Sequence, residues 1–167
     1  MRTYLEPTNT RIISLIVADP SKNGIIPVPI PSQAKGTLIV SPLSLLSNWT
    51  SQISQHLHDS TLSVLVFHGL TKSDPKINLD DYDVVITSYG TLMSDYKAQN
   101  LENNPTKKPA KNTKSFFGRL WRRVVLDEGH TIRNPKTKYS RAATRIDAVA
   151  RWSLTGLHHA RPIFTEN

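Results

Sequence analysis

The fold of this chain is decided by residues 121–135, which read WRRVVLDEGHTIRNP. The apolar run Val124-Val125-Leu126 is typical of a short buried strand, and two carboxylates, Asp127 and Glu128, follow it directly. Adjacent carboxylates at the end of a strand can hold a divalent metal and polarise a water molecule. Because an Asp-Glu pair alone is a weak signal, its meaning depends on the segments around it.

Four further short apolar runs have the length and composition of strands. They are residues 37–40, 62–67, 83–87 and 151–155. Helical patterns lie between them, in residues 43–57, from 88 through Leu92 and Met93, and in 138–149. Strands that alternate with helices predict an α/β fold in three layers, with a parallel sheet covered on both faces. Residues 11–18 are also apolar, and their pattern fits either a strand or a buried helix.

Polar residues occur where these predicted strands end. They are Ser41, Thr87, Asp127, Glu128 and Thr155. In open α/β sheets the functional side chains gather at the carboxyl ends of the strands. We therefore expect these five residues to lie along one edge of the sheet.

Composition limits the class of partner. The chain has 167 residues, enough for one domain, and a formal net charge of +8, which favours a polyanion such as nucleic acid. It has no cysteine, so it contains neither disulfides nor thiolate metal sites. No apolar run approaches the ~20 residues of a membrane helix, so we expect no membrane partner.

The most basic segment is also the least like a regular element. Residues 103–126 contain seven lysines or arginines and no acidic residue, and their first half is polar with two prolines. This composition predicts a flexible basic loop at about 98–115. Two interpretations remain open: a solvated insertion, or a loop whose Lys107 and Lys108 contact nucleic-acid phosphates.

Four segments in order resemble motifs of the Swi/Snf-type DNA translocases in the helicase-like superfamily. Residues 121–135 resemble the Walker B region, most of all in the branch of the helicase-like transcription factor and the fungal DNA-damage-tolerance translocases. Residues 37–49 (TLIVSPLSLLSNW) look like motif Ia, 83–92 (DVVITSYGTL) like motif Ib/Ic, and 151–156 (RWSLTG) like the start of motif III. The resemblance spans residues 11–156 and implies the first RecA-like lobe of a P-loop NTPase-type ATPase.

The resemblance implies a nucleotide site that uses ATP and magnesium. Asp127 would hold the magnesium through water, if nucleotide binds, and Glu128 would orient the attacking water. His130 would connect this site to motif III through Thr155, and Thr155 with Gly156 would couple nucleotide state to the grip on DNA.

The resemblance also implies double-stranded DNA as a partner, a nuclear location, and chromatin or repair-complex proteins as further partners. The residues expected along the DNA track are Ser41, Pro42, Asn48, Thr87, Ser88 and Tyr89, with Lys107 and Lys108 as candidates in the basic loop. Such contacts position a protein on the phosphate backbone without reading sequence. We interpret Trp49 and Trp152 as core anchors, with base stacking as the alternative.

Both ends depart from the family pattern. Residues 4–11 (YLEPTNTR) contain neither the glycines nor the Lys-Ser/Thr pair of a phosphate loop, and Leu157-His158-His159 replaces the usual continuation of motif III. We therefore expect divergent ends at 1–10 and 157–167, a sheet incomplete at its N-terminus, and an apolar surface left exposed on residues 12–17. A first-lobe fragment of this kind should hydrolyse ATP negligibly. The alternative is a non-catalytic module that binds DNA or a protein partner.

Overall fold

The computed structural model describes residues 8–18, 34–56, 62–69, 71, 74–104, 106–109, 112–154 and 161–162. Its helices are α1 (Thr8–Ala18), α2 (Leu46–His56), α3 (Tyr89–Ala98) and α4 (Lys138–Thr144). Short 3-10 helices are η1 (Leu43–Leu45), η3 (Leu79–Asp81) and η4 (Gly129–Ile132). The strands are β1 (Lys35–Ser41), β2 (Val64–Val66), β3 (Val84–Ser88), β4 (Leu120–Leu126), β5 (Asp147–Ser153) and β6 (Arg161–Pro162).

The strands form one sheet in the order β2-β3-β1-β4-β5-β6. The first five are parallel, and only the two-residue β6 pairs antiparallel, beside β5. Strand β1 lies in the centre, where Ile39 is paired with Ile86 of β3 and Val125 of β4. The predicted parallel α/β sheet is therefore confirmed.

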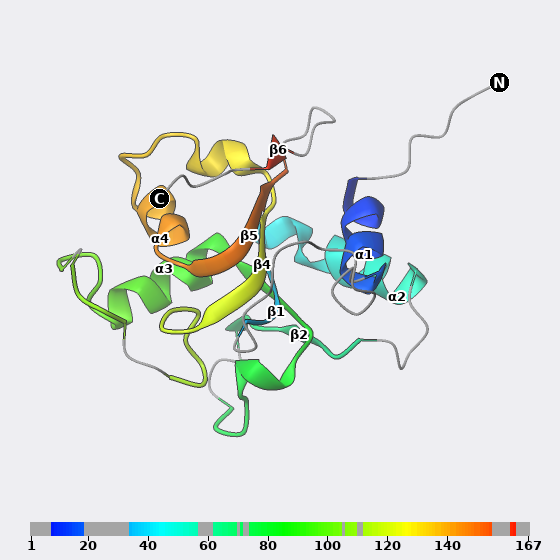
Figure 1. Cartoon of the computed structure of the whole chain (residues 1–167), viewed down its shortest axis with the longest axis horizontal. Helices are drawn as coiled ribbons and strands as arrows, with labels where there is room; N and C mark the ends of the chain where they lie inside the picture. The colour runs from blue at the N-terminus through cyan, green and yellow to red at the C-terminus, as the bar shows by residue number, and fades with distance from the viewer. Residues whose placement is uncertain are drawn as a thin grey trace.

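Helices cover both faces of this sheet, as Figure 1 shows. Strand residues alternate between the two faces, so Leu38 and Val124 point to one and Ile39 and Val125 to the other. On the first face the core is completed by α3 and α4, and on the second by α1 and α2. The three layers are the predicted ones.

The segment that sequence could not assign, residues 11–18, is helical and belongs to α1. Ile12, Ile13 and Ile16 are buried in the second core against α2, whereas Leu15 and Val17 are exposed. The expectation of an exposed apolar surface on 12–17 is thus correct for only part of this helix, because α2 covers the rest.

The helix predicted over residues 138–149 is too long. Helix α4 ends at Thr144, and β5 begins at Asp147. Pairing with β4 explains the early end, because Asp147 and Ala148 lie in parallel register with Leu120 and Trp121. The first residues of β5 give hydrogen-bond partners to the main chain of β4. If the helix continued through these residues, that part of β4 would lack partners on this side.

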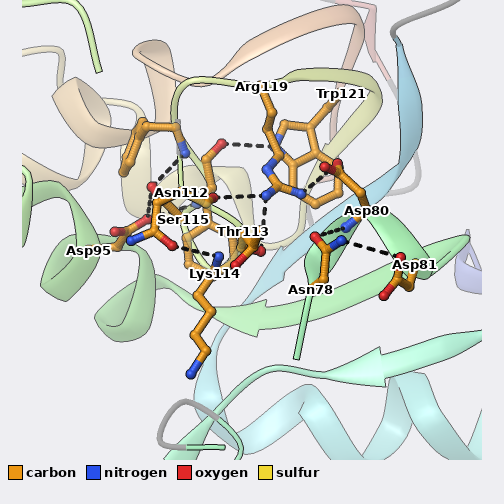
Figure 2. A network of polar contacts seen from close by, with 12 residues as sticks. Asn78, Asp80, Asp81, Asp95, Asn112, Thr113, Lys114, Ser115, Arg119 and Trp121 are labelled. Atoms are coloured by element: carbon orange, nitrogen blue, oxygen red, sulfur yellow. Dashed lines mark hydrogen bonds and ion pairs between the residues drawn. The ribbon is translucent and has the colours of Figure 1, made fainter. Parts of the chain in front are cut away.

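The described residues of the basic segment 98–115 are tied to the fold. The Ser115 hydroxyl donates to Asp95 of α3 at 2.9 Å (Figure 2), and the Phe116 amide donates to the same carboxylate at 2.8 Å. The carbonyl of Thr113 accepts the Leu79 amide at 2.8 Å. Phe116 then enters the core completely. Residues 113, 115 and 116 are thus hydrogen-bonded to the fold, and the flexibility of the basic segment stays a prediction.

Candidate nucleotide turn and nucleic-acid groove

Strand β4 delivers Asp127 to the carboxyl edge of the sheet, beside the end of β1. The Asp127 amide donates to the carbonyl of Val40 at 2.8 Å, which continues the ladder by one residue. Its side chain is buried and accepts three hydrogen bonds. Oδ2 accepts from Ser41 Oγ at 2.9 Å and Trp49 Nε1 at 2.8 Å, and Oδ1 accepts from the Glu128 amide at 2.9 Å. Hydrogen bonds to a charged group each contribute about 1.5–3 kcal/mol, so this carboxylate is held in one orientation.

The three residues after Asp127 form a tight turn, here called the Asp127 turn with Asp127 included (127–130). Glu128 adopts a left-handed conformation with φ of 50°, which is uncommon outside glycine. The Gly129 amide donates to Leu154 of the neighbouring chain segment at 2.7 Å. A Cβ on Gly129 would lie 1.8 Å from Ser153 Oγ, so only glycine fits this close approach.

Glu128 and His130 are at the mouth of the turn. Nδ1 of His130 lies 2.9 Å from Oε2 of Glu128, and the histidine side chain is 69% exposed. The predicted bridge from His130 to Thr155 stays a prediction, because Thr155 and Gly156 lie outside the described residues. The partner that the structure assigns to His130 is Glu128.

The Asp127 turn could hold magnesium through a water ligand of the ion. No group of three or more potential metal ligands is present among the described residues, and both Asp127 oxygens already accept donors from the protein. The remaining acceptor capacity suits a water ligand of the ion, which is how magnesium often binds. Asp127 alone would hold the hydrated metal, which would neutralise phosphate charge when nucleotide is bound.

A groove lies along the same edge, at the ends of β1, β2 and β3. This carboxyl-edge groove has a volume of about 460 Å³. Its lining residues are Pro42, Leu43, His68, Gly69, Ser88, Tyr89, Gly90, Thr91 and Ser94. Ser88 caps α3 by accepting the Thr91 amide at 3.1 Å, which leaves exposed Gly90 in the first helical turn. Main-chain N–H groups at a helix start attract anions such as phosphate.

The residues expected along the DNA track differ in position and exposure in the structure. Pro42 and Ser88 line the groove, and Asn48 is exposed on α2. The hydroxyls of Ser41 and Thr87 point inward instead: both residues are fully buried, and Thr87 donates to the carbonyl of Phe67 at 2.9 Å. These two hydroxyls support the strand ends in the structure, and a contact of these residues with DNA stays a prediction.

Tyr89 is also mostly buried, and its Oη donates to the Asp127 carbonyl at 2.8 Å. Lys107 and Lys108 lie elsewhere, in a second cavity that includes Lys35 at the opposite end of β1. The structure therefore does not bring these two lysines to the groove.

Three contributors were missed from sequence. Trp49 was interpreted as a core anchor, and it is fully buried, but its indole also donates to Asp127. His68 and Thr91 join in the groove, with 2.9 Å between His68 Nδ1 and Thr91 Oγ1. The position of His68 directly after a predicted strand was the available signal, whereas nothing local distinguishes Thr91.

A three-layer parallel sheet with a carboxylate turn and a groove at its carboxyl edge defines a RecA-like ATPase lobe. The sequence pattern of the SNF2-related domain matches residues 10–157, and the chain belongs to that family. Among solved structures, the SWI2/SNF2 ATPase core of Sulfolobus solfataricus in complex with dsDNA is similar, with a TM-score of 0.61 and 26% identity over 89% of this chain and 25% of that one.

Curated relatives are more similar in sequence. The DNA repair protein RAD5B of Arabidopsis thaliana is 39% identical over 122 residues, which are 72% of this chain and 9% of that protein. The human helicase-like transcription factor is 34% identical over 128 residues, 76% of this chain and 12% of the relative. The DNA repair protein RAD5 of Mycosarcoma maydis is 32% identical over 127 residues, which are 75% of this chain and 9% of that protein. The chain thus spans about a tenth of the length of these relatives.

No helix in the described parts of the chain is long and apolar enough to cross a membrane.

Proposed function

We propose that this chain forms the DNA-gripping and carboxylate-presenting part of the first lobe of an ATP-dependent translocase on double-stranded DNA. The observation that carries the proposal is the position of Tyr89. This residue lines the carboxyl-edge groove and at the same time donates a hydrogen bond to Asp127. A structural change in the groove or in the Asp127 turn would therefore alter the surroundings of Tyr89.

On the DNA side, the groove suits the phosphate backbone. Exposed Gly90 places the first main-chain amides of α3 within reach of an anion, and exposed Ser94 adds a hydroxyl to a lining that is otherwise mostly apolar. None of these groups reads a base edge, so binding would be independent of sequence, as a translocase requires. Asn48 on α2 would add a backbone contact beside the groove.

On the nucleotide side, Asp127 would receive the hydrated magnesium of ATP, and Glu128 would orient the attacking water. His130 would hold Glu128 in position, since their side chains are 2.9 Å apart. Thr155 and Gly156 would couple the two sites. By analogy with the repair proteins that it resembles, the chain would act in the nucleus with chromatin or repair-complex proteins.

A second function is favoured by the hydrogen bonds that Asp127 already accepts within the protein. Its carboxylate already accepts three protein donors, and residues 4–11 contain no phosphate loop. The chain would then be a module that binds DNA or a protein partner without hydrolysing ATP. The two functions share the groove and differ in ATP turnover.

The groove is tested by the binding of a fluorescent 20-base-pair duplex, followed by anisotropy at several salt concentrations. Leu43, 60% exposed in the groove, is changed to Glu, and Leu15, 47% exposed on α1, is changed to Glu as the matched control. We expect Leu43→Glu to weaken binding about tenfold through repulsion of phosphate, and Leu15→Glu to bind as the unchanged chain does. Binding should also weaken as salt rises.

Equal affinities for the two variants, or affinity that does not depend on salt, would remove the groove as the DNA site. Hydrolysis of Mg-ATP, measured with and without duplex, separates the two functions. Turnover that is stimulated by DNA and abolished in Glu128→Gln supports the translocase. DNA binding without turnover supports the module.

A further inference from the structure

A second cavity lies at the amino edge of the sheet, opposite the Asp127 turn. It has a volume of about 890 Å³. Its floor is formed where three parallel strands begin, at Lys35 of β1, Leu120 of β4 and Asp147 of β5. The size falls within the range of small-molecule sites. Nothing in the groove or in the Asp127 turn makes use of it.

The charge of this amino-edge cavity is strongly positive. Five cationic side chains line it, and two carboxylates, Asp80 and Asp147, oppose them. The five are Lys35, Lys107, Lys108, Arg119 and Arg145. Asp80 is already engaged, because Arg119 Nη1 donates to it at 2.8 Å. A positive concave surface concentrates anions from solution.

Arg119 is held rigidly at this cavity, and Figure 2 shows its contacts. Nη2 donates to the carbonyls of Asn112 and Thr113, each at 3.0 Å, and the guanidinium lies 5.6 Å from the centre of the Trp121 ring. The side chain is only 8% exposed. Burial lowers the pKa of Arg119, while Asp80 and Asp95 raise it, and an arginine remains charged under such conditions.

One donor of Arg119 is left over. Its Nε is buried, and no acceptor lies within hydrogen-bond distance among the described residues. A buried donor without a partner costs about 1–3 kcal/mol. The Nε of Arg145 is in the same situation. Because both Nε atoms have almost no exposed surface, a bound ligand would meet the other cationic groups of the cavity and not these two atoms.

The loop that carries the lysines is fixed before any ligand binds. Arg145 Nη2 donates to the Lys107 carbonyl at 2.6 Å, and the Lys107 amide donates to the carbonyl of Asn104 at 3.0 Å. Lys107 and Lys108 are both exposed, and the Lys107 ammonium donates to the carbonyl of Gln99 at 2.8 Å. A preformed loop reduces the entropy lost on binding.

We propose that the amino-edge cavity binds a compact anion that carries several phosphate groups. Arginine and lysine are the usual partners of phosphate oxygens, and five of them line this cavity. The concave shape suits a small polyphosphate better than a duplex, whose phosphates lie on a broad convex surface. The site is independent of the groove and of ATP hydrolysis.

The test is titration calorimetry with inorganic tripolyphosphate, which has the charge and no base or sugar. The double variant Lys107→Ala/Lys108→Ala removes two charges from the cavity. The control Lys76→Ala/Lys136→Ala removes two from exposed positions outside its lining. We expect one-to-one binding that the first variant weakens roughly tenfold and the control leaves within about twofold.

Changes in the NMR chemical shifts of backbone amides on addition of tripolyphosphate locate the site. Shifts at Lys35, Lys107 and Arg119 support the cavity, and shifts confined to Gly90 or Glu128 overturn it. The proposal also fails if binding is not saturable, or if both double variants weaken it equally. Loss of duplex affinity in Lys107→Ala/Lys108→Ala without any tripolyphosphate binding would overturn the small-anion site in favour of nucleic acid.

Discussion

The hydroxyl of Tyr89 donates a 2.8 Å hydrogen bond to the main-chain carbonyl of Asp127, across 38 residues of sequence. Tyr89 is the first residue of α3, and its ring packs edge-on against Tyr139 at 6.4 Å between ring centres. Burial, together with the charges of Asp127 and Glu128, raises the pKa of Tyr89 well above its usual range. The hydroxyl therefore keeps its proton at pH values at which an ordinary tyrosine would lose it, and it can continue to donate to the Asp127 carbonyl.

Tyr89→Phe should remove this connection while the ring packing is kept. The Asp127 carbonyl would lose its side-chain donor, at a cost of about 1 kcal/mol in the free energy of unfolding. Urea denaturation measures the change, with Tyr139→Phe as the control, because Tyr139 is exposed. A Tyr89→Phe protein as stable as the unchanged chain would show that the bond contributes nothing.

The bond from Trp49 to Asp127 should appear as a coupling energy. Trp49→Phe removes the indole donor, and Asp127→Ala removes the carboxylate oxygen that accepts it. Because each single change also has unrelated costs, the double-mutant cycle isolates the pair, and we expect about 1.5–3 kcal/mol of coupling. Additive effects in denaturation experiments would mean that the indole and the carboxylate do not interact.

Gly129→Ala should destabilise the fold, because the new Cβ would collide with Ser153 Oγ. Overpacking of this kind costs about 1–3 kcal/mol. Adding Ser153→Gly removes the obstructing side chain and should recover much of the loss. Gly90→Ala is the matched control: its Cβ has only one neighbour, Ser88 Oγ at 3.8 Å, and in a helix alanine gains up to about 1 kcal/mol over glycine.

Thermal unfolding of the four proteins checks these values. If Gly129→Ala melts at the same temperature as the unchanged chain, the close approach of the Asp127 turn to β5 is wrong.

The surface pair of Glu102 and Lys138 should be visible in a pH titration. Nζ of Lys138 lies 2.6 Å from Oε1 of Glu102, and this hydrogen bond lowers the pKa of the glutamate, opposed by desolvation and assisted by the charges of Lys138 and Lys97. A lowered pKa means that the contribution to stability is present above the unfolded-state pKa and is lost as pH falls through the folded-state pKa.

An NMR titration of the Glu102 carboxyl should therefore give a midpoint below that of an ordinary glutamate. Lys138→Ala should return it toward the ordinary value, whereas Lys136→Ala, two residues away, should leave it unchanged. If the titration midpoint of Glu102 is the same in Lys138→Ala as in the unchanged chain, the ion pair does not form in solution.

The outline of the fold was readable from sequence because apolar runs of strand length alternate with amphipathic helices. Residues 37–40 and 124–126 were placed in strands correctly. The end of α4 was not, because Asp147 to Val149 resemble helix locally and become a strand only through their register with β4. Residues 11–18 stayed ambiguous because a short apolar run buries equally well in either form.

The sequence by itself determined the family, the parallel sheet and the position of Asp127 and Glu128 at a strand end, since these depend on local pattern and chain order. Only the tertiary structure decided what the polar residues beside them do. Ser41, Trp49 and Tyr89 lie between 38 and 86 residues from Asp127 in sequence, and the parallel sheet brings all three to one turn. A hydroxyl that faces solvent and one that faces a buried carboxylate look alike in sequence. The difference comes from burial, which is a property of the packed layers and not of any single segment.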